Sequence, residues 1–173
     1  MRPKARPMSN DPAKGAIIKV LIGEAHCAQA PHVLQAVVGS CIAVGMFDPV
    51  KGIAGMAHVL LPYASDRDES VLPAKFADKA IPCLRSSLLE LGADARRLKA
   101  KIAGGAQMFR DAQSCRGSDI GAINACAVRD MLAKYGIGLL GHVTGGFEGR
   151  KVELRLDTYG MRVECFGGES LEI

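Results

Sequence analysis

Tryptophan is absent from the sequence, and aromatic residues make up only 5% of its 173 residues, although 49% of the residues are hydrophobic. A buried core must therefore consist mainly of Ala, Val, Ile and Leu side chains, and the length suits one domain with one core. A membrane-spanning helix needs an apolar run of about 20 residues, and no run in this sequence is nearly that long, so membrane insertion is not expected.

Long stretches of one charge are also absent. The net charge is +4, and no block of Lys and Arg alternates with aromatic residues, so no nucleic-acid partner is expected. The N-terminal sequence MRPKARPMSNDPAKG has basic residues near Met1 but no apolar run after them, unlike a secretory signal. We therefore expect a cytoplasmic protein with a disordered tail over residues 1–15 and a single domain over residues 16–173.

Closely spaced cysteine pairs are missing as well. None of the six cysteines lies in a Cys-x-x-Cys motif, so no zinc-site spacing is present. In a reducing compartment such cysteines are free thiols, mostly buried as small hydrophobic side chains. The glycine pairs in KIAGGAQMF and TGGFEGR match neither a P-loop nor a dinucleotide-binding fingerprint, and they predict turns at strand ends.

Apolar and alternating runs predict strands at residues 16–25, 32–39, 41–49, 53–62, 97–106, 137–146, 150–158 and 161–166. The runs 41–49 and 53–62 flank a polar turn and predict a hairpin. Helices are predicted from Asp78, as N-cap, to Leu91 and over residues 121–136. Pro82 is expected in the first turn of the first helix.

The apolar faces of these two helices are predicted to consist of Ile81, Leu84, Leu88 and Leu91 in the first, and Ile123, Val128, Met131, Leu132 and Tyr135 in the second. Several strands, a helix, a strand, a helix and further strands follow one another along the chain. This order argues against a regular doubly wound fold and predicts an α+β protein, with helices covering partly antiparallel sheets.

The stretch VVGSCIAVGMFDP, residues 37–49, places Cys41 after a Gly-Ser turn and at the start of an apolar run. A thiol has an unperturbed pKa of about 8.5 and needs a base to react near neutral pH, which a histidine usually supplies. The predicted hairpin brings His58 opposite the Cys41 end, and adjacent strands lie about 4.8 Å apart. Either the two form a catalytic pair, or His58 is a half-buried strand histidine bonded to a backbone carbonyl.

Gly39 and Ser40 precede the cysteine. A glycine there allows a tight turn, so the N–H groups of residues 40 and 41 are candidates for an oxyanion hole. The alternative interpretation is an ordinary strand break.

Taken in order, the segments VVGSCIAVGMFDP, GMAHVLLP, KFADKAIPCL, AKIAGGAQMF, IGAINACAVRDMLAKYGI and TGGFEGRKVEL resemble the chemoreceptor glutamine deamidase family, CheD. The resemblance extends from about residue 17 to residue 172. It implies a three-layer α/β/β arrangement of packed sheets covered by helices, similar to the catalytic domains of deamidating bacterial toxins. It also implies hydrolysis of particular glutamine side chains to glutamate on methyl-accepting chemotaxis receptors, as part of chemotaxis adaptation.

By this resemblance the nucleophile is Cys41, the base is His58, and no metal or organic cofactor is required. The expected partners are the cytoplasmic helices of the receptors and, as in some members, a CheC-type phosphatase. At the position of the family's third active-site residue, a threonine, this chain has Gln35. Three outcomes follow: the Gln35 side chain orients His58, a backbone carbonyl does so while Gln35 shapes the pocket, or activity is weakened.

Other functions remain open on the sequence alone. One is a catalytically weakened binding module for a CheC-type phosphatase or a receptor. A second is a different cysteine hydrolase on the same scaffold, such as a peptidase or a transglutaminase. A metal site formed by Cys41, His58 and another histidine is a third, which no ligand spacing favours.

Overall fold

The computed structural model describes residues 15–65, 72–108 and 119–173. The predicted N-terminal tail lies almost wholly outside these residues, as does Cys115. The described strands and helices are, in chain order, β1 (Ile17–Lys19), β2 (Ala25–Gln29), β3 (Val33–Val38), β4 (Ile42–Asp48), β5 (Ile53–Val59), α1 (Ala77–Glu90), β6 (Lys99–Gly104), α2 (Ile120–Lys134), β7 (Gly138–Thr144), β8 (Arg150–Arg155), β9 (Met161–Cys165) and β10 (Ser170–Glu172).

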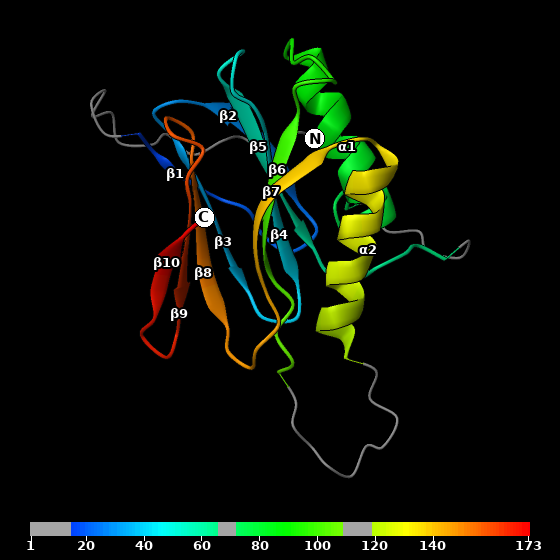
Figure 1. The fold of residues 1–173 in the computed structure, drawn as a ribbon, viewed down its shortest axis with the longest axis vertical. Coiled ribbons are helices and arrows are strands. Elements are labelled where there is room, and N and C mark those ends of the chain that lie inside the picture. The colour runs from blue at the N-terminus through cyan, green and yellow to red at the C-terminus, as the bar shows by residue number, and fades with distance from the viewer. Residues whose placement is uncertain (1–14, 66–71, 109–118) are drawn as a thin grey trace, which may run out of the picture.

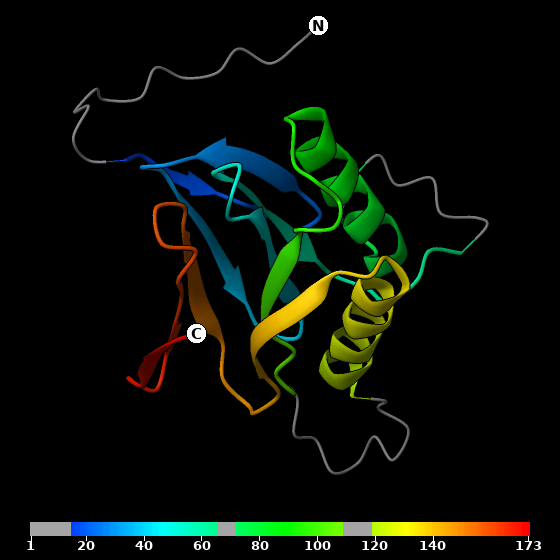
Figure 2. The ribbon, with the colours of Figure 1, turned by 45° about the horizontal axis from the view of Figure 1, so that its top comes forward.

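The strands form two five-stranded mixed sheets. Sheet A has the order β1-β3-β8-β9-β10, and sheet B has the order β2-β5-β4-β6-β7. The sheets face each other, and both helices lie on the side of sheet B that faces away from sheet A (Figures 1 and 2). The three layers are therefore helices, sheet B and sheet A, which confirms the predicted α+β class.

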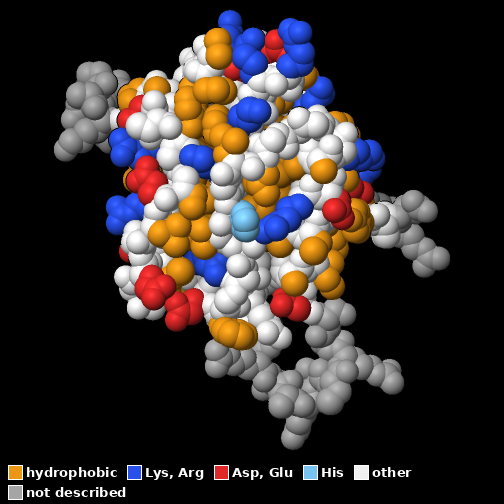
Figure 3. All heavy atoms as spheres, in the orientation of Figure 1, with side chains coloured by type: hydrophobic (Ala, Val, Ile, Leu, Met, Phe, Trp, Pro, Cys, Tyr) orange, Lys and Arg blue, Asp and Glu red, His pale blue; other side chains and the backbone are white. Residues whose placement is uncertain are grey.

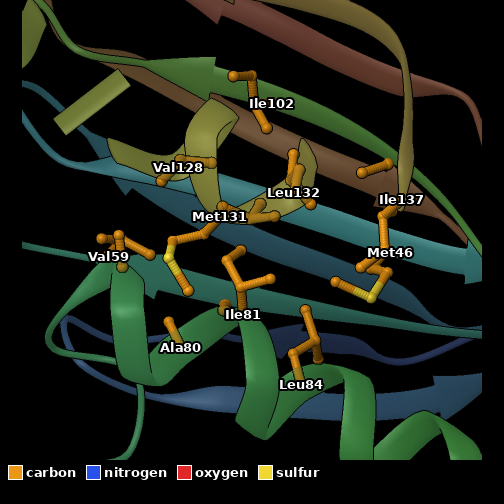
Figure 4. Packing of buried hydrophobic residues seen from close by; sticks show 14 of the residues in the cluster. Met46, Val59, Ala80, Ile81, Leu84, Ile102, Val128, Met131, Leu132 and Ile137 are labelled. Carbon is orange, nitrogen blue, oxygen red and sulfur yellow. The ribbon is translucent and has the colours of Figure 1, made fainter. Parts of the chain in front are cut away.

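Sheet B is the middle layer and has an apolar cluster on each side. One cluster lies between sheet B and the helices, where Ile81 and Leu84 of α1 and Met131 and Leu132 of α2 meet the sheet (Figure 4). The other cluster lies between the two sheets. Every residue of β4 and β5 is buried, because both faces of these strands are covered. This explains why their sequences are continuously apolar and do not alternate.

The predicted hairpin is confirmed: β4 and β5 pair antiparallel from Ile42↔Val59 to Asp48↔Ile53. The buried carboxylate of Asp48 closes it, since it accepts the N–H groups of the turn residues Val50 and Lys51 at 3.0 and 3.2 Å.

The same carboxylate accepts both Nε and Nη2 of Arg97, at 3.0 and 2.8 Å, and this ion pair holds the pKa of Asp48 well below its usual range. Arg97 belongs to the loop that follows α1, and Lys and Arg side chains gather at that end of the molecule (Figure 3). There Arg96 also pairs with Asp94 at 3.0 Å, so part of this positive charge is neutralised.

The single strand predicted over residues 16–25 is wrong. The chain leaves sheet A after β1, crosses to sheet B through residues 20–24, and enters β2 at Ala25. Leu21 and Ile22 made the run look like one buried strand, but they are 61% and 51% exposed. Strand β10 was not predicted.

Several helix details also differ from the prediction. Asp78 is not the N-cap of α1, and its carboxylate instead accepts the N–H of Ala64 at 3.2 Å. The N-cap is Phe76, because its backbone is still extended and the helix begins at Ala77. Pro82 consequently lies in the second turn rather than the first. Leu91 and Ile123 are 51% and 39% exposed, so neither belongs to a buried helix face.

Candidate active site

The β4–β5 hairpin places Cys41 and His58 on the same face of sheet B. Ala43 lies directly opposite His58, and Cys41 and Ala43 both belong to the apolar cluster between the sheets. Cys41 is therefore the diagonal neighbour of His58, a position in which Cα atoms are about 7–8 Å apart. Cys41 is 7% exposed and His58 is 2% exposed, so both side chains lie in a largely water-free layer.

The imidazole of His58 is oriented by the backbone of Val20. Its Nδ1 lies 3.1 Å from the Val20 carbonyl oxygen. A carbonyl only accepts, so Nδ1 carries the proton and Nε2 carries the free lone pair. Nε2 is buried and has no hydrogen-bond partner among the described residues. His58 thus makes the backbone bond of an ordinary strand histidine, and it also keeps a basic nitrogen available.

Burial controls the charges of the pair. It lowers the pKa of His58, and this effect outweighs the Val20 carbonyl and the Glu24 carboxylate, which favour the protonated ring. It also raises the pKa of the Cys41 thiol, partly offset by the backbone N–H of Cys41 itself. Near neutral pH the resting pair is therefore a neutral thiol and a neutral imidazole, and the thiolate forms only when the proton moves to the ring.

The side chain of Gln35 does not hydrogen-bond His58. Its Nε2 donates to Oε1 of Glu153 at 2.8 Å. The backbone carbonyl of Gln35 instead accepts the N–H of Val20 at 2.8 Å, and so it holds the residue that orients His58. The contacts agree with the second of the outcomes considered above in that a backbone carbonyl, and not the Gln35 side chain, bonds His58. The effect of Gln35 on activity stays a prediction.

A cavity of about 300 Å³ lies beside His58 and is lined by Lys19, Val20, Leu21, Ile22, Gln35, Ala36 and Val37. Leu21 and Val37 are 61% and 55% exposed, so the cavity has an apolar rim. The main chain of residues 19–22 forms one of its sides, because it crosses from sheet A to sheet B at this point.

The loop Gly39–Cys41 is held by its three carbonyls. The N–H of Ala106 donates to the carbonyl of Gly39 at 2.8 Å, and the N–H of Gly105 donates to the carbonyl of Cys41 at 2.8 Å. Nδ2 of Asn124 donates to the carbonyl of Ser40 at 3.0 Å. Within the described part of the chain, no backbone carbonyl accepts the N–H of Ser40 or of Cys41, and the N–H of Cys41 faces its own thiol. These two amide groups are the candidate donors to an oxygen atom bound beside the thiol.

Arg150 reaches the ends of β6 and β7, next to this loop, from the other sheet. It begins β8 of sheet A and is 5% exposed. Its Nη1 donates to the carbonyls of Gly104 and Val143 at 2.8 and 3.0 Å, and its Nη2 donates to the carbonyl of Gly145. The pair Gly104-Gly105 lies at the end of β6 and the pair Gly145-Gly146 directly follows β7, so both lie at strand ends, as predicted. The guanidinium of Arg150 binds a carbonyl of each pair and so connects these two ends.

Sequence reasoning missed three residues of this site: Val20, Asn124 and Arg150. Val20 acts through its main chain, and no side-chain motif reveals such a role. Asn124 is completely buried on the α2 face that also contains Ala125 and Val128. A polar residue inside an apolar helical stripe is the signal that could have found it.

The remaining cysteines of the described chain are free thiols, and one of them, Cys27, lies in β2. No three His, Cys, Asp or Glu side chains within residues 15–65, 72–108 and 119–173 are grouped so that they could hold a metal ion. None of the helices described has both the length and the apolar character required to cross a membrane.

Comparison with known proteins gives consistent matches. Residues 60–165 match the family model described as CheD chemotactic sensory transduction. The chain is 43% identical over 154 residues to the chemoreceptor glutamine deamidase CheD of Thermotoga maritima, which covers 88% of this chain and 94% of that protein. It is 39% identical over 151 residues to the probable chemoreceptor glutamine deamidase CheD of Clostridium kluyveri, covering 87% of this chain and 93% of that protein.

Proposed function

Because the chain belongs to the CheD family, we propose that it deamidates glutamine side chains of chemotaxis receptors, with Cys41 as nucleophile and His58 as general base. The observation that carries the mechanism is the hydrogen bonding of His58, which assigns its tautomer. Nδ1 is bound to the Val20 carbonyl, and Nε2 is left unpartnered on the face that Cys41 shares.

The reaction is an acyl transfer in two steps. Nε2 of His58 takes the thiol proton, and the Cys41 sulfur attacks the carbon of the glutamine side-chain amide. The N–H groups of Ser40 and Cys41 stabilise the negative oxygen of the tetrahedral intermediate. The imidazolium then gives its proton to the departing ammonia, which leaves a thioester. Neutral His58 activates water, and hydrolysis releases glutamate and the free thiol.

The product adds one negative charge to a receptor helix for each glutamine converted. A like-charge pair on neighbouring helical positions changes stability by about 0.2–0.5 kcal/mol. Such small terms, repeated over several sites, bias a two-state signalling equilibrium. This is how deamidation would contribute to adaptation in the cytoplasm. A CheC-type phosphatase as a further partner stays a prediction, to be tested by co-purification.

The test is intact and peptide mass spectrometry of a receptor cytoplasmic fragment incubated with this protein. We expect a gain of about one mass unit at defined glutamines, with release of ammonia, and no conversion by Cys41→Ala. Cys126→Ala removes an exposed cysteine of α2 and serves as the matched control, with conversion unchanged.

Other results would favour the other candidate functions. Cleavage of the receptor chain would indicate a peptidase. Receptor binding without conversion, by both the wild type and Gln35→Thr, would indicate a binding module. Conversion by Gln35→Thr alone would show that the natural Gln35 silences the enzyme.

A further inference from the structure

We propose that Asn124 is a positioning residue that fixes the orientation of the oxyanion-binding peptide between Ser40 and Cys41. This inference rests on the proposed function and adds to it a residue of α2 that does not touch the reacting atoms. Asn124 is 0% exposed, and its Nδ2 donates to two carbonyls, Ser40 at 3.0 Å and Leu60 at 2.9 Å.

The two carbonyls determine which way the amide of Asn124 is turned. Carbonyl oxygens only accept, so the side-chain nitrogen must face both of them, and each of its two hydrogens is used. One carbonyl belongs to the loop before the nucleophile, and the other lies two residues after His58. Asn124 therefore links the segment that bears the thiol to the segment that bears the base.

The bond from Asn124 to the Ser40 carbonyl also fixes the direction of the Cys41 N–H, because both groups belong to one planar peptide. In a planar trans peptide the C=O and the N–H point in opposite directions. The carbonyl of Ser40 points to Asn124 on α2, which covers one face of sheet B, so the N–H of Cys41 points away from α2. The Cys41 side chain belongs to the cluster on the opposite face, so this N–H points to the thiol side of the sheet.

Two glycines allow α2 to approach closely enough for this contact. A Cβ on Gly121 would collide with the carbonyl oxygen of Gly105, and a Cβ on Gly105 would lie 2.8 Å from the carbonyl oxygen of Gly121. Gly105 also has φ +69°, a conformation that other residues adopt at a penalty. No side chain therefore separates α2 from residues 104–106, which bind the loop Gly39–Cys41, and the short side chain of Asn124 reaches the Ser40 carbonyl.

The Oδ1 atom of Asn124 is buried and has no hydrogen-bond partner among the described residues. The polar contacts of this side chain are therefore the two bonds that Nδ2 donates to Ser40 and Leu60. An apolar residue in its place would leave both carbonyls without this donor, so the Ser40–Cys41 peptide would lose the contact that orients it.

The experiment compares Asn124→Leu and Asn124→Ala with the wild type, using the same receptor fragment. We expect kcat to fall about 100-fold, the lower end of the loss seen when an oxyanion donor is removed, with KM little changed. Alkylation of Cys41 by iodoacetamide, followed by peptide mass spectrometry, should proceed at the wild-type rate. This displacement forms no oxyanion, so it reports the thiol and His58 alone.

Leu132→Ala is the matched control, since it removes a completely packed side chain of the same helix. We expect it to lower the unfolding temperature but to leave kcat unchanged while the protein is folded. A wild-type kcat in either folded Asn124 variant would overturn the inference. So would a parallel loss of alkylation and deamidation, because it would indicate a general distortion of the site. Failure of the wild type to deamidate would instead refute the proposed function, and this inference with it.

Discussion

Replacing Arg150 by Lys should loosen the end of the molecule where the two sheets meet. The guanidinium donates to the carbonyls of Gly104, Val143 and Gly145, and Arg150 is 5% exposed. A hydrogen bond to a charged group contributes about 1.5–3 kcal/mol, and a carbonyl left buried without a donor is destabilising. A single ammonium lacks the planar fork that spans three acceptors. The loss of two such bonds should therefore lower the free energy of unfolding by about 3 kcal/mol.

Urea unfolding measures this change. With a slope of about 2 kcal/mol per molar urea, the midpoint should fall by about 1.5 M. Arg155→Lys is the control on the same strand, because Arg155 is half-exposed and pairs only with Asp157 among the described residues, at 3.0 Å. Its effect should stay within about 0.5 kcal/mol. A midpoint shift for Arg150→Lys no larger than that for Arg155→Lys would refute the reasoning.

Three further predictions concern pH, the hairpin and the pocket. Burial lowers the pKa of His58, and activity needs the unprotonated ring. As the pH falls, kcat/KM should therefore keep its pH 7 value until the pH is below 6.5. A decline that already begins above pH 7 would contradict this. Asp48→Asn removes the buried carboxylate and leaves Arg97 with Asp94 as its acidic partner, so it should lower the free energy of unfolding by about 2 kcal/mol in urea unfolding at pH 7. Because the pKa of Asp48 is lowered in the folded state, the gap between wild type and variant should shrink as the pH falls below about 4, and a constant gap would count against the ion pair. Gln35→Thr should leave kcat near the wild-type value, because Val20 and not Gln35 orients His58; a large gain in the receptor assay would show that Gln35 impairs the enzyme.

The best sequence-based predictions concerned residues that are neighbours through local pairing. The hairpin of β4 and β5 follows from two apolar runs around a short polar turn, so the approach of His58 to the Cys41 end could be foreseen. The α+β class followed from the order of strands and helices. The error over residues 16–25 has a different cause, because hydrophobicity does not show at which residue a chain leaves one sheet for the other.

The sequence by itself determined the hairpin, the apolar cores and the family resemblance, since these depend on residue types and on spacings along the chain. Only the tertiary structure decided how the site is held. The Val20 carbonyl reaches His58 from the crossover between the sheets, Asn124 reaches Ser40 from α2, and Arg150 reaches Gly104 from sheet A. Each contact joins residues distant in sequence, and in all three the acceptor is a backbone carbonyl, a group that every residue has. Such contacts are specified by the packing of the layers, which no local motif encodes.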